Sequence, residues 1–197
     1  MSDPMSNPMS NPTSPSQPQG ILTADQTAWL KRYVRSIPDY PQPGILFRDI
    51  TPLLQHAPTL RFAIDVMASR YRHMGIEAVV GIESRGFILG TPLAYILGTG
   101  FVPVRKKGKL PGTTITVEYD LEYGSNVLEM HTDALQPGQR VLVVDDLLAT
   151  GGTTAGTVKL VQRLGAEVIS LAFLIELSML GGRERLPGQD VFALLSY

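Results

Sequence analysis

Short runs of apolar residues recur along the chain, and segments with helical spacing are interleaved with them. Four such runs are Ala78–Ile82, Phe101–Val104, Val141–Val144 and Val168–Ile175. A strand that is apolar at nearly every position belongs in a parallel sheet with both faces covered by helices. The sequence therefore predicts an α/β fold with a central, mainly parallel sheet. Active sites of such sheets lie beyond the carboxyl ends of the strands.

The segments between these runs predict the remaining elements. Apolar residues spaced for one helical face predict helices over Ala24–Arg35, Leu60–Tyr71, Phe87–Leu97 and Thr153–Leu164. Thr23 followed by Gln26 resembles a capping box, whereas Pro92 fits poorly inside a helix. The proline-rich stretch Pro38–Gly44 predicts a loop. A hairpin is expected from the pair of runs Thr113–Tyr119 and Asn126–Thr132.

Composition excludes several classes of function. The 197 residues include 17 Lys and Arg against 18 Asp and Glu, so the net charge is −1 and no general nucleic-acid-binding surface is expected. The chain has no cysteine, which excludes disulfides and thiol chemistry and suits the reducing cytoplasm. No apolar run is long enough to span a membrane. The histidines, at 56, 73 and 131, match no metal-ligand spacing.

The first twenty residues differ from the rest of the chain. They repeat Met-Ser-Asp/Asn-Pro tetrads and hold five of the fifteen prolines. A segment with so little apolar surface cannot offset the entropy cost of becoming ordered. We therefore expect residues 1–20 to form a disordered tail and residues 21–197 to form one domain.

The segment VLVVDDLLATGGT, Val141–Thr153, carries the strongest chemical signal. An apolar strand ends in Asp145 and Asp146, and a turn of small residues then opens a helix. Glycines let successive backbone N–H groups face one point, and the helix start adds partial positive charge, so the turn predicts a site for a phosphate monoester. Thr150 and Thr153 would donate further hydrogen bonds. The turn has neither the Gly-Lys-Ser/Thr of a Walker loop nor the spacing of a dinucleotide fingerprint.

Two carboxylates beside a phosphate need an explanation, because like charges repel. Asp145 and Asp146 could accept hydrogen bonds from the two hydroxyls of a ribose, and a magnesium ion could offset the charge. The segment then predicts a ribose 5-phosphate site. A plain strand, turn and capped helix without a ligand is the alternative.

Three further segments carry charged or aromatic residues whose role their own pattern leaves open. Four cations at residues 105, 106, 107 and 109 could be a solvated surface run, a nucleic-acid patch or a pyrophosphate clamp. Arg85, in the Glu83–Gly86 turn after a strand, would by its pattern alone be a surface arginine. Phe47 would by its pattern alone be a core aromatic.

Taken together, these segments resemble the type I phosphoribosyltransferases, and in particular the members that use adenine. The resemblance covers about residues 37–195. It is carried by Val141–Thr153, PGILFRDIT at Pro43–Thr51, ESRGF at Glu83–Phe87, VRKKGKLPG at Val104–Gly112 and YDLEYG at Tyr119–Gly124.

The resemblance implies the type I phosphoribosyltransferase fold, with a small hood and a flexible hairpin loop. The implied reaction transfers the 5-phosphoribosyl group from phosphoribosyl pyrophosphate to adenine and forms AMP and pyrophosphate, in purine salvage. It further implies Mg²⁺ carried by the substrate, with no metal held directly by the protein, a homodimer and a cytoplasmic location. Two alternatives stay open: a same-fold enzyme for a 6-oxopurine or orotate, and a non-catalytic regulator that senses phosphoribosyl pyrophosphate.

The resemblance also implies residue roles. The ribose ligands are Asp145 and Asp146. The 5′-phosphate ligands are Ala149, Thr150, Gly151, Gly152 and Thr153. The pyrophosphate ligands are Arg85, Lys106 and Lys109, next to a cis peptide bond between Glu83 and Ser84. The adenine site is formed by Leu46, Phe47 and Arg48.

The proton of adenine needs a separate acceptor. In the 6-oxopurine relatives an aspartate of the phosphate turn is thought to serve this purpose, but Ala149 stands at that place here. The resemblance assigns the catalytic role to Glu122 of YDLEYG. A surface glutamate on a hairpin tip is the alternative.

Overall fold

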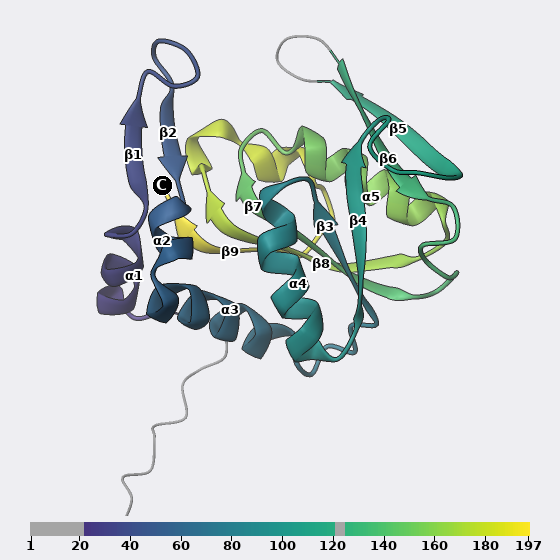
Figure 1. Ribbon diagram of the computed structural model, residues 1–197, viewed down its shortest axis with the longest axis horizontal. Coiled ribbons are helices and arrows are strands. Elements are labelled where there is room, and N and C mark those ends of the chain that lie inside the picture. Colours follow the sequence, from purple (N-terminus) through teal and green to yellow (C-terminus); the bar gives the residue numbers. More distant parts are fainter. Residues whose placement is uncertain (1–21, 121–124) are drawn as a thin grey trace, which may run out of the picture.

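A seven-stranded sheet in the order β5-β6-β4-β3-β7-β8-β9 organises the computed structural model, which describes residues 22–120 and 125–197 (Figure 1). The strands are β3 (Ala78–Ile82), β4 (Gly100–Lys106), β5 (Thr114–Asp120), β6 (Ser125–His131), β7 (Arg140–Leu148), β8 (Glu167–Glu176) and β9 (Val191–Ser196). Neighbours from β4 to β9 are parallel, whereas β6 joins β4, and β5 joins β6, antiparallel. The predicted α/β fold with a mainly parallel sheet is confirmed.

Helices cover both faces of this sheet. They are α1 (Ala24–Lys31), α2 (Thr51–Gln55), α3 (Ala57–Tyr71), α4 (Arg85–Leu97) and α5 (Gly152–Arg163). Adjacent residues of one strand serve different cores: Val79 packs in the cluster with α3 and α4, and Val80 packs in the cluster with α5. Burial on both faces explains why β3, with the sequence AVVGI, has no polar position. None of the helices in the described ranges is long and apolar enough to cross a membrane.

A separate two-stranded hairpin, β1 (Arg35–Pro38) with β2 (Leu46–Asp49), stands beside the sheet and forms the hood (Figure 1). The predicted first helix begins with its capping box at Thr23 and Gln26 but ends at Lys31, so its extension to Arg35 was wrong. Arg35 instead pairs with Asp49 across the hairpin, and its Nε donates to Asp49 Oδ2 at 3.0 Å. Pairing with a distant segment overrides the local helical spacing.

Other local predictions agree with the structure. The helix over Phe87–Leu97 exists as α4 and continues through Pro92, and the hairpin exists as β5 and β6. The strand β9, the short helix α2 and the 3₁₀ turns η1 (Ser178–Leu180) and η2 (Gly182–Arg185) were not predicted. The tail, residues 1–20, lies outside the described residues.

Candidate functional site

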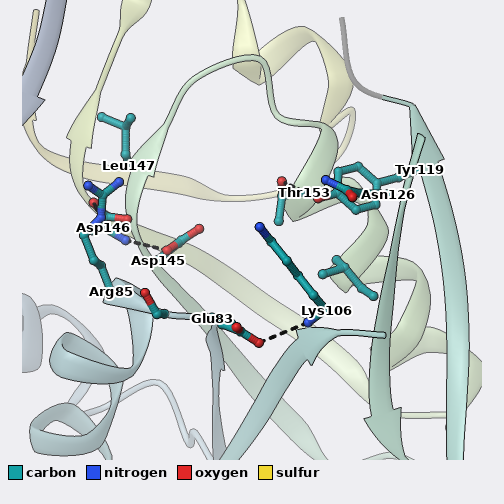
Figure 2. A pocket seen from close by; sticks show the side chains of 11 residues that line it. Glu83, Arg85, Lys106, Tyr119, Asn126, Asp145, Asp146, Leu147 and Thr153 are labelled. Carbon is teal, nitrogen blue, oxygen red and sulfur yellow. Dashed lines mark hydrogen bonds and ion pairs between the residues drawn. The ribbon is translucent and has the colours of Figure 1, made fainter. Parts of the chain in front are cut away.

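A cavity of about 480 Å³ opens at the carboxyl ends of β3, β4 and β7, where a parallel sheet is expected to carry its site (Figure 2). It is lined by Glu83, Ser84, Arg85, Lys106, Tyr119, Asn126, Leu128, Asp145, Asp146, Leu147 and Thr153. Five of these residues, from three separate segments, were predicted from the sequence to bind substrate. They are Arg85, Lys106, Asp145, Asp146 and Thr153. The fold brings them into one cavity.

Asp145 and Asp146, the aspartate pair, follow the buried part of β7. Burial and the neighbouring Asp146 carboxylate raise the pKa of Asp145 well above its ordinary value. Burial also raises the pKa of Asp146, although the Arg85 guanidinium, with its Nε 2.7 Å from Asp146 Oδ2, opposes that change. The Asp146 N–H donates to Asp145 Oδ1 at 2.8 Å. Without a ligand, two ionised carboxylates at this place are therefore costly.

The start of α4 lies directly against the aspartate pair. A Cβ at Gly86 would come within 2.8 Å of the Val144 carbonyl oxygen and 3.0 Å of Asp145 Oδ1, so only glycine permits this approach. The partial positive charge of the helix N-terminus thereby faces the two carboxylates. The Glu83–Ser84 peptide bond just before α4 is cis, as the family resemblance implied.

Residues Ala149–Thr153, the phosphate loop, connect β7 to α5. They line a second cavity of about 80 Å³, which shares Asp145, Leu147 and Thr153 with the first. Gly151 has a φ of 80°, which favours glycine, and caps α5. The Thr153 hydroxyl donates to the Tyr119 hydroxyl at 3.2 Å, which fixes this loop end against β5. The predicted phosphate site thus has the expected strand, turn and helix.

Residues Arg105–Lys109, the basic loop, are held by two carboxylates. Glu83 Oε2 accepts from Arg105 Nε at 2.9 Å and from the Lys106 N–H at 3.2 Å. The Arg105 guanidinium also donates to the Lys109 carbonyl at 2.9 Å, so it holds the loop together. Lys106 extends into the cavity, whereas Lys109 does not line it (Figure 2).

The second carboxylate is Glu129 on β6, which is only 3% exposed. Its Oε1 accepts from the backbone N–H groups of Lys109 and Leu110, both at 2.7 Å. Burial opposes ionisation, but the N–H groups of Leu110, Gly108 and Lys109 outweigh it and hold the pKa of Glu129 below its usual value. An ionised Glu129 therefore sets the shape of the basic loop.

Arg85 contacts both the hood and the cavity. The Arg85 guanidinium carbon lies 5.4 Å from the centre of the Phe47 ring while the same side chain pairs with Asp146. Arg48 points elsewhere: its guanidinium donates to the Ser36 hydroxyl and lies 4.1 Å from the centre of the Tyr197 ring. Leu46, Phe47 and Arg48 do not line the 480 Å³ cavity.

Some residues of the site were missed from sequence. Tyr119 and Asn126 line the cavity and are directly paired across β5 and β6. Their pairing follows from the predicted hairpin, so the strand register of that hairpin could have identified Tyr119 and Asn126 as neighbours. Glu129 had no local signal, and Glu83, although it stands in the ESRGF segment, had none for its contact with the basic loop, because the partners of both residues lie about twenty residues away in sequence. Glu122 lies outside the described residues.

Comparison with known proteins gives one consistent family. The model of the phosphoribosyl transferase domain matches residues 50–187. An adenine phosphoribosyltransferase of Carboxydothermus hydrogenoformans is 58% identical over 168 residues, which cover 85% of this chain and 99% of the relative.

Solved structures agree. The adenine phosphoribosyltransferase of Rhodothermus marinus superposes with a TM-score of 0.85 at 53% identity, covering 89% of this chain and 100% of that one. The enzyme of Saccharomyces cerevisiae, solved with an imino-altritol bisphosphate and adenine, has a TM-score of 0.82 at 40% identity and covers 88% of this chain and 100% of its own.

Proposed function

The chain belongs to the phosphoribosyl transferase family, among the members that use adenine, and from this premise we propose how its cavity performs the reaction. The reaction transfers the 5-phosphoribosyl group from phosphoribosyl pyrophosphate to adenine, and the products are AMP and pyrophosphate. It belongs to purine salvage. One observation carries the assignment of roles: the aspartate pair, Thr153 of the phosphate loop and Lys106 of the basic loop line one cavity, and Asp145 also lines the cavity of the phosphate loop.

The aspartate pair binds the ribose. Its carboxylates accept hydrogen bonds from the two ring hydroxyls, which compensates the burial that raises the pKa of both groups. As the bond to pyrophosphate lengthens, positive charge develops on the ribose ring, as in an oxocarbenium ion. Carboxylates already in position stabilise that charge without reorganisation.

The two ends of the donor bind to different loops. The phosphate loop holds the 5′-phosphate through backbone N–H groups at the start of α5 and the Thr150 hydroxyl, and the Thr153 hydroxyl exchanges its bond to Tyr119 for one to the phosphate. Arg85, Lys106 and Lys109 stabilise the departing pyrophosphate. A Mg²⁺ ion carried by the substrate would neutralise part of the pyrophosphate charge, and the carboxylates of Asp145 and Asp146 beside the site offer the oxygen ligands that such an ion prefers.

Adenine binds under the hood. Phe47 stacks on the purine, Leu46 packs beside it, and Arg48 acts through its backbone because its side chain contacts Ser36 and Tyr197. Arg85, which contacts both Phe47 and Asp146, connects the adenine site to the ribose site. Glu122 accepts the proton that adenine loses.

We also infer a homodimer that acts in the cytoplasm. An apolar patch supports the dimer: on α4, Ile88, Tyr95 and Ile96 are exposed, and Tyr95 is 87% exposed. Ile88 and Ile96 line a groove that continues onto α3. A second copy would bury this patch. Light scattering should give a dimeric mass for the wild type and a monomeric mass for Tyr95→Glu combined with Ile88→Asp. A monomeric wild type would contradict the dimer.

The test of the function is a comparison of acceptors. The protein is incubated with phosphoribosyl pyrophosphate and Mg²⁺, together with adenine, guanine, hypoxanthine or orotate in separate reactions. We expect AMP from adenine and at most traces of nucleotide from the others. Faster turnover of a 6-oxopurine or of orotate would contradict adenine as the substrate, and binding of phosphoribosyl pyrophosphate without any turnover would favour a regulator.

A further inference from the structure

The backbone after β8 lies directly against the phosphate loop, and the functional roles above leave this segment unused. Residues Ser178–Arg185, here the latch segment, comprise the turns η1 and η2. Leu177 immediately precedes the latch segment, and Leu148 immediately precedes the phosphate loop. The Leu177 N–H donates to the Leu148 carbonyl at 2.9 Å, so the two segments begin side by side. The two segments run together although about thirty residues separate them.

Two glycines permit a contact that no side chain would allow. A Cβ at Gly182 would overlap the carbonyl oxygen of Ala149 and come within 3.0 Å of the Leu148 side chain. A Cβ at Gly151 would in turn overlap the carbonyl oxygen of Gly182. Gly182 is buried and Gly151 has a φ of 80°. The phosphate loop and the latch segment therefore touch through their backbones.

An ion pair anchors the latch segment in this place. The Arg183 guanidinium donates from Nε and NH2 to the two carboxylate oxygens of Glu176, at 2.7 and 2.8 Å. Its NH1 donates to the Val191 carbonyl at 2.8 Å. Glu176 ends β8 and its side chain is largely buried, while Val191 begins β9. The last two strands of the sheet, β8 and the edge strand β9, thus fix the position of Gly182, one residue before Arg183.

The contact constrains one peptide group of the phosphate loop. The Ala149 carbonyl oxygen faces Gly182, and the peptide bond between Ala149 and Thr150 is trans. In a trans peptide the C=O and N–H groups point in opposite directions. The Thr150 N–H is therefore directed away from the latch segment, and it belongs to a residue that lines the 80 Å³ cavity of the phosphate loop.

We propose that the latch segment is a positioning element for the 5′-phosphate, in which Gly182, held by Arg183 and Glu176, orients the Ala149–Thr150 peptide. The proposal rests on the proposed function, because it assumes that the phosphate loop binds the 5′-phosphate. It assigns a role to Gly182 and Arg183, neither of which lines the 480 Å³ cavity or the 80 Å³ cavity. Pyrophosphate, which binds at the basic loop, should not depend on them.

Gly182→Ala is the sharpest test. Gly182 has an ordinary φ, so alanine there perturbs the contact with Ala149 without straining the backbone of residue 182. The affinity for AMP is measured by calorimetry, and inhibition by inorganic pyrophosphate is measured in the forward assay. A backbone hydrogen bond to a charged group is worth enough for about a tenfold to a hundredfold change in affinity. We expect AMP binding and the KM for phosphoribosyl pyrophosphate to worsen by about that factor, and pyrophosphate inhibition to stay within about twofold.

Gly100→Ala is the matched control, because Gly100 also has an ordinary φ and a Cβ there would meet nothing within 4 Å. Arg183→Ala releases the anchor without crowding the loop, so it decides the question if Gly182→Ala does not fold. Arg183→Ala should weaken the affinity for AMP several-fold, and Arg183→Lys should restore part of that affinity. Melting temperatures are measured for all variants.

Two results would overturn the inference. One is a folded Gly182→Ala that binds AMP as the wild type does. The other is a parallel loss of AMP and pyrophosphate affinity in Gly182→Ala or Arg183→Ala, which would mean that the segment supports the fold in general. A wild-type chain that binds no AMP would contradict the proposed function itself, and with it the inference.

Discussion

Replacing Glu129 with glutamine should weaken pyrophosphate binding although Glu129 does not line the 480 Å³ cavity. The carboxylate accepts two backbone N–H groups of the segment that carries Lys106 and Lys109, each at 2.7 Å. Glutamine has nearly the same shape and keeps one oxygen acceptor, but it lacks the charge. The substitution therefore tests whether an ionised Glu129 holds the basic loop in its binding shape.

The size of the effect follows from these two bonds. A hydrogen bond to a charged group contributes about 1.5–3 kcal/mol and one between neutral groups about 0.5–1.5 kcal/mol, so two bonds lose about 2 kcal/mol together. A neutral amide costs less to bury than a carboxylate, which offsets part of the loss. A net loss of about 1–2 kcal/mol in the stability of the ordered basic loop lowers the population of that loop. The affinity for pyrophosphate then falls by about fivefold to thirtyfold.

The assay compares ligands with and without pyrophosphate. We expect Glu129→Gln to raise the KM for phosphoribosyl pyrophosphate and the inhibition constant of pyrophosphate by that factor, and to leave AMP affinity within about twofold. Glu77→Gln is the control, since Glu77 also accepts a backbone N–H, from Arg140 at 2.8 Å, away from the site. Unchanged pyrophosphate inhibition in Glu129→Gln would refute the role of the carboxylate, and an equal loss of AMP affinity would show a general loss of structure.

Four further results are expected. Lys109→Ala should weaken phosphoribosyl pyrophosphate more than AMP in steady-state inhibition assays, because AMP lacks pyrophosphate; equal losses would count against the clamp. Asp145→Asn should raise the free energy of unfolding at pH 7, measured in urea, while turnover falls, because it removes a partly buried carboxylate whose raised pKa makes its charged form costly in the folded chain; a less stable variant would contradict this. Glu122→Leu should slow single-turnover chemistry by about 10²–10⁴-fold with donor binding nearly intact, and a rate within about threefold of wild type would exclude it as the proton acceptor. Asp49, whose pKa is lowered to about 2 by Thr51 and Arg35, should contribute at most about 2 kcal/mol of stability that is fully present above pH 4 and lost as the pH falls toward 2, so urea curves of wild type and Asp49→Asn should converge over that window.

The local sequence pattern was sufficient to predict the elements whose determining residues are contiguous in the chain. The apolar runs at β3, β7 and β8 predicted a sheet covered on both faces, because a strand without polar positions can be stable only there. The acidic pair and the glycine turn of Val141–Thr153 predicted the phosphate loop, because strand end, turn and helix start are contiguous in sequence. The capping box at Thr23 is local in the same sense.

The support of these parts depends on contacts between segments that are distant in sequence. The hood exists because Arg35–Pro38 meets Leu46–Asp49, and a four-residue strand carries too little pattern to override helical spacing in a prediction. Glu129 holds the basic loop, and Gly182 lies on Ala149, through contacts between residues about twenty or thirty positions apart. Such contacts depend on where the sheet places each strand end. A carboxylate or a glycine therefore looks ordinary in the sequence until the fold brings its partner to it.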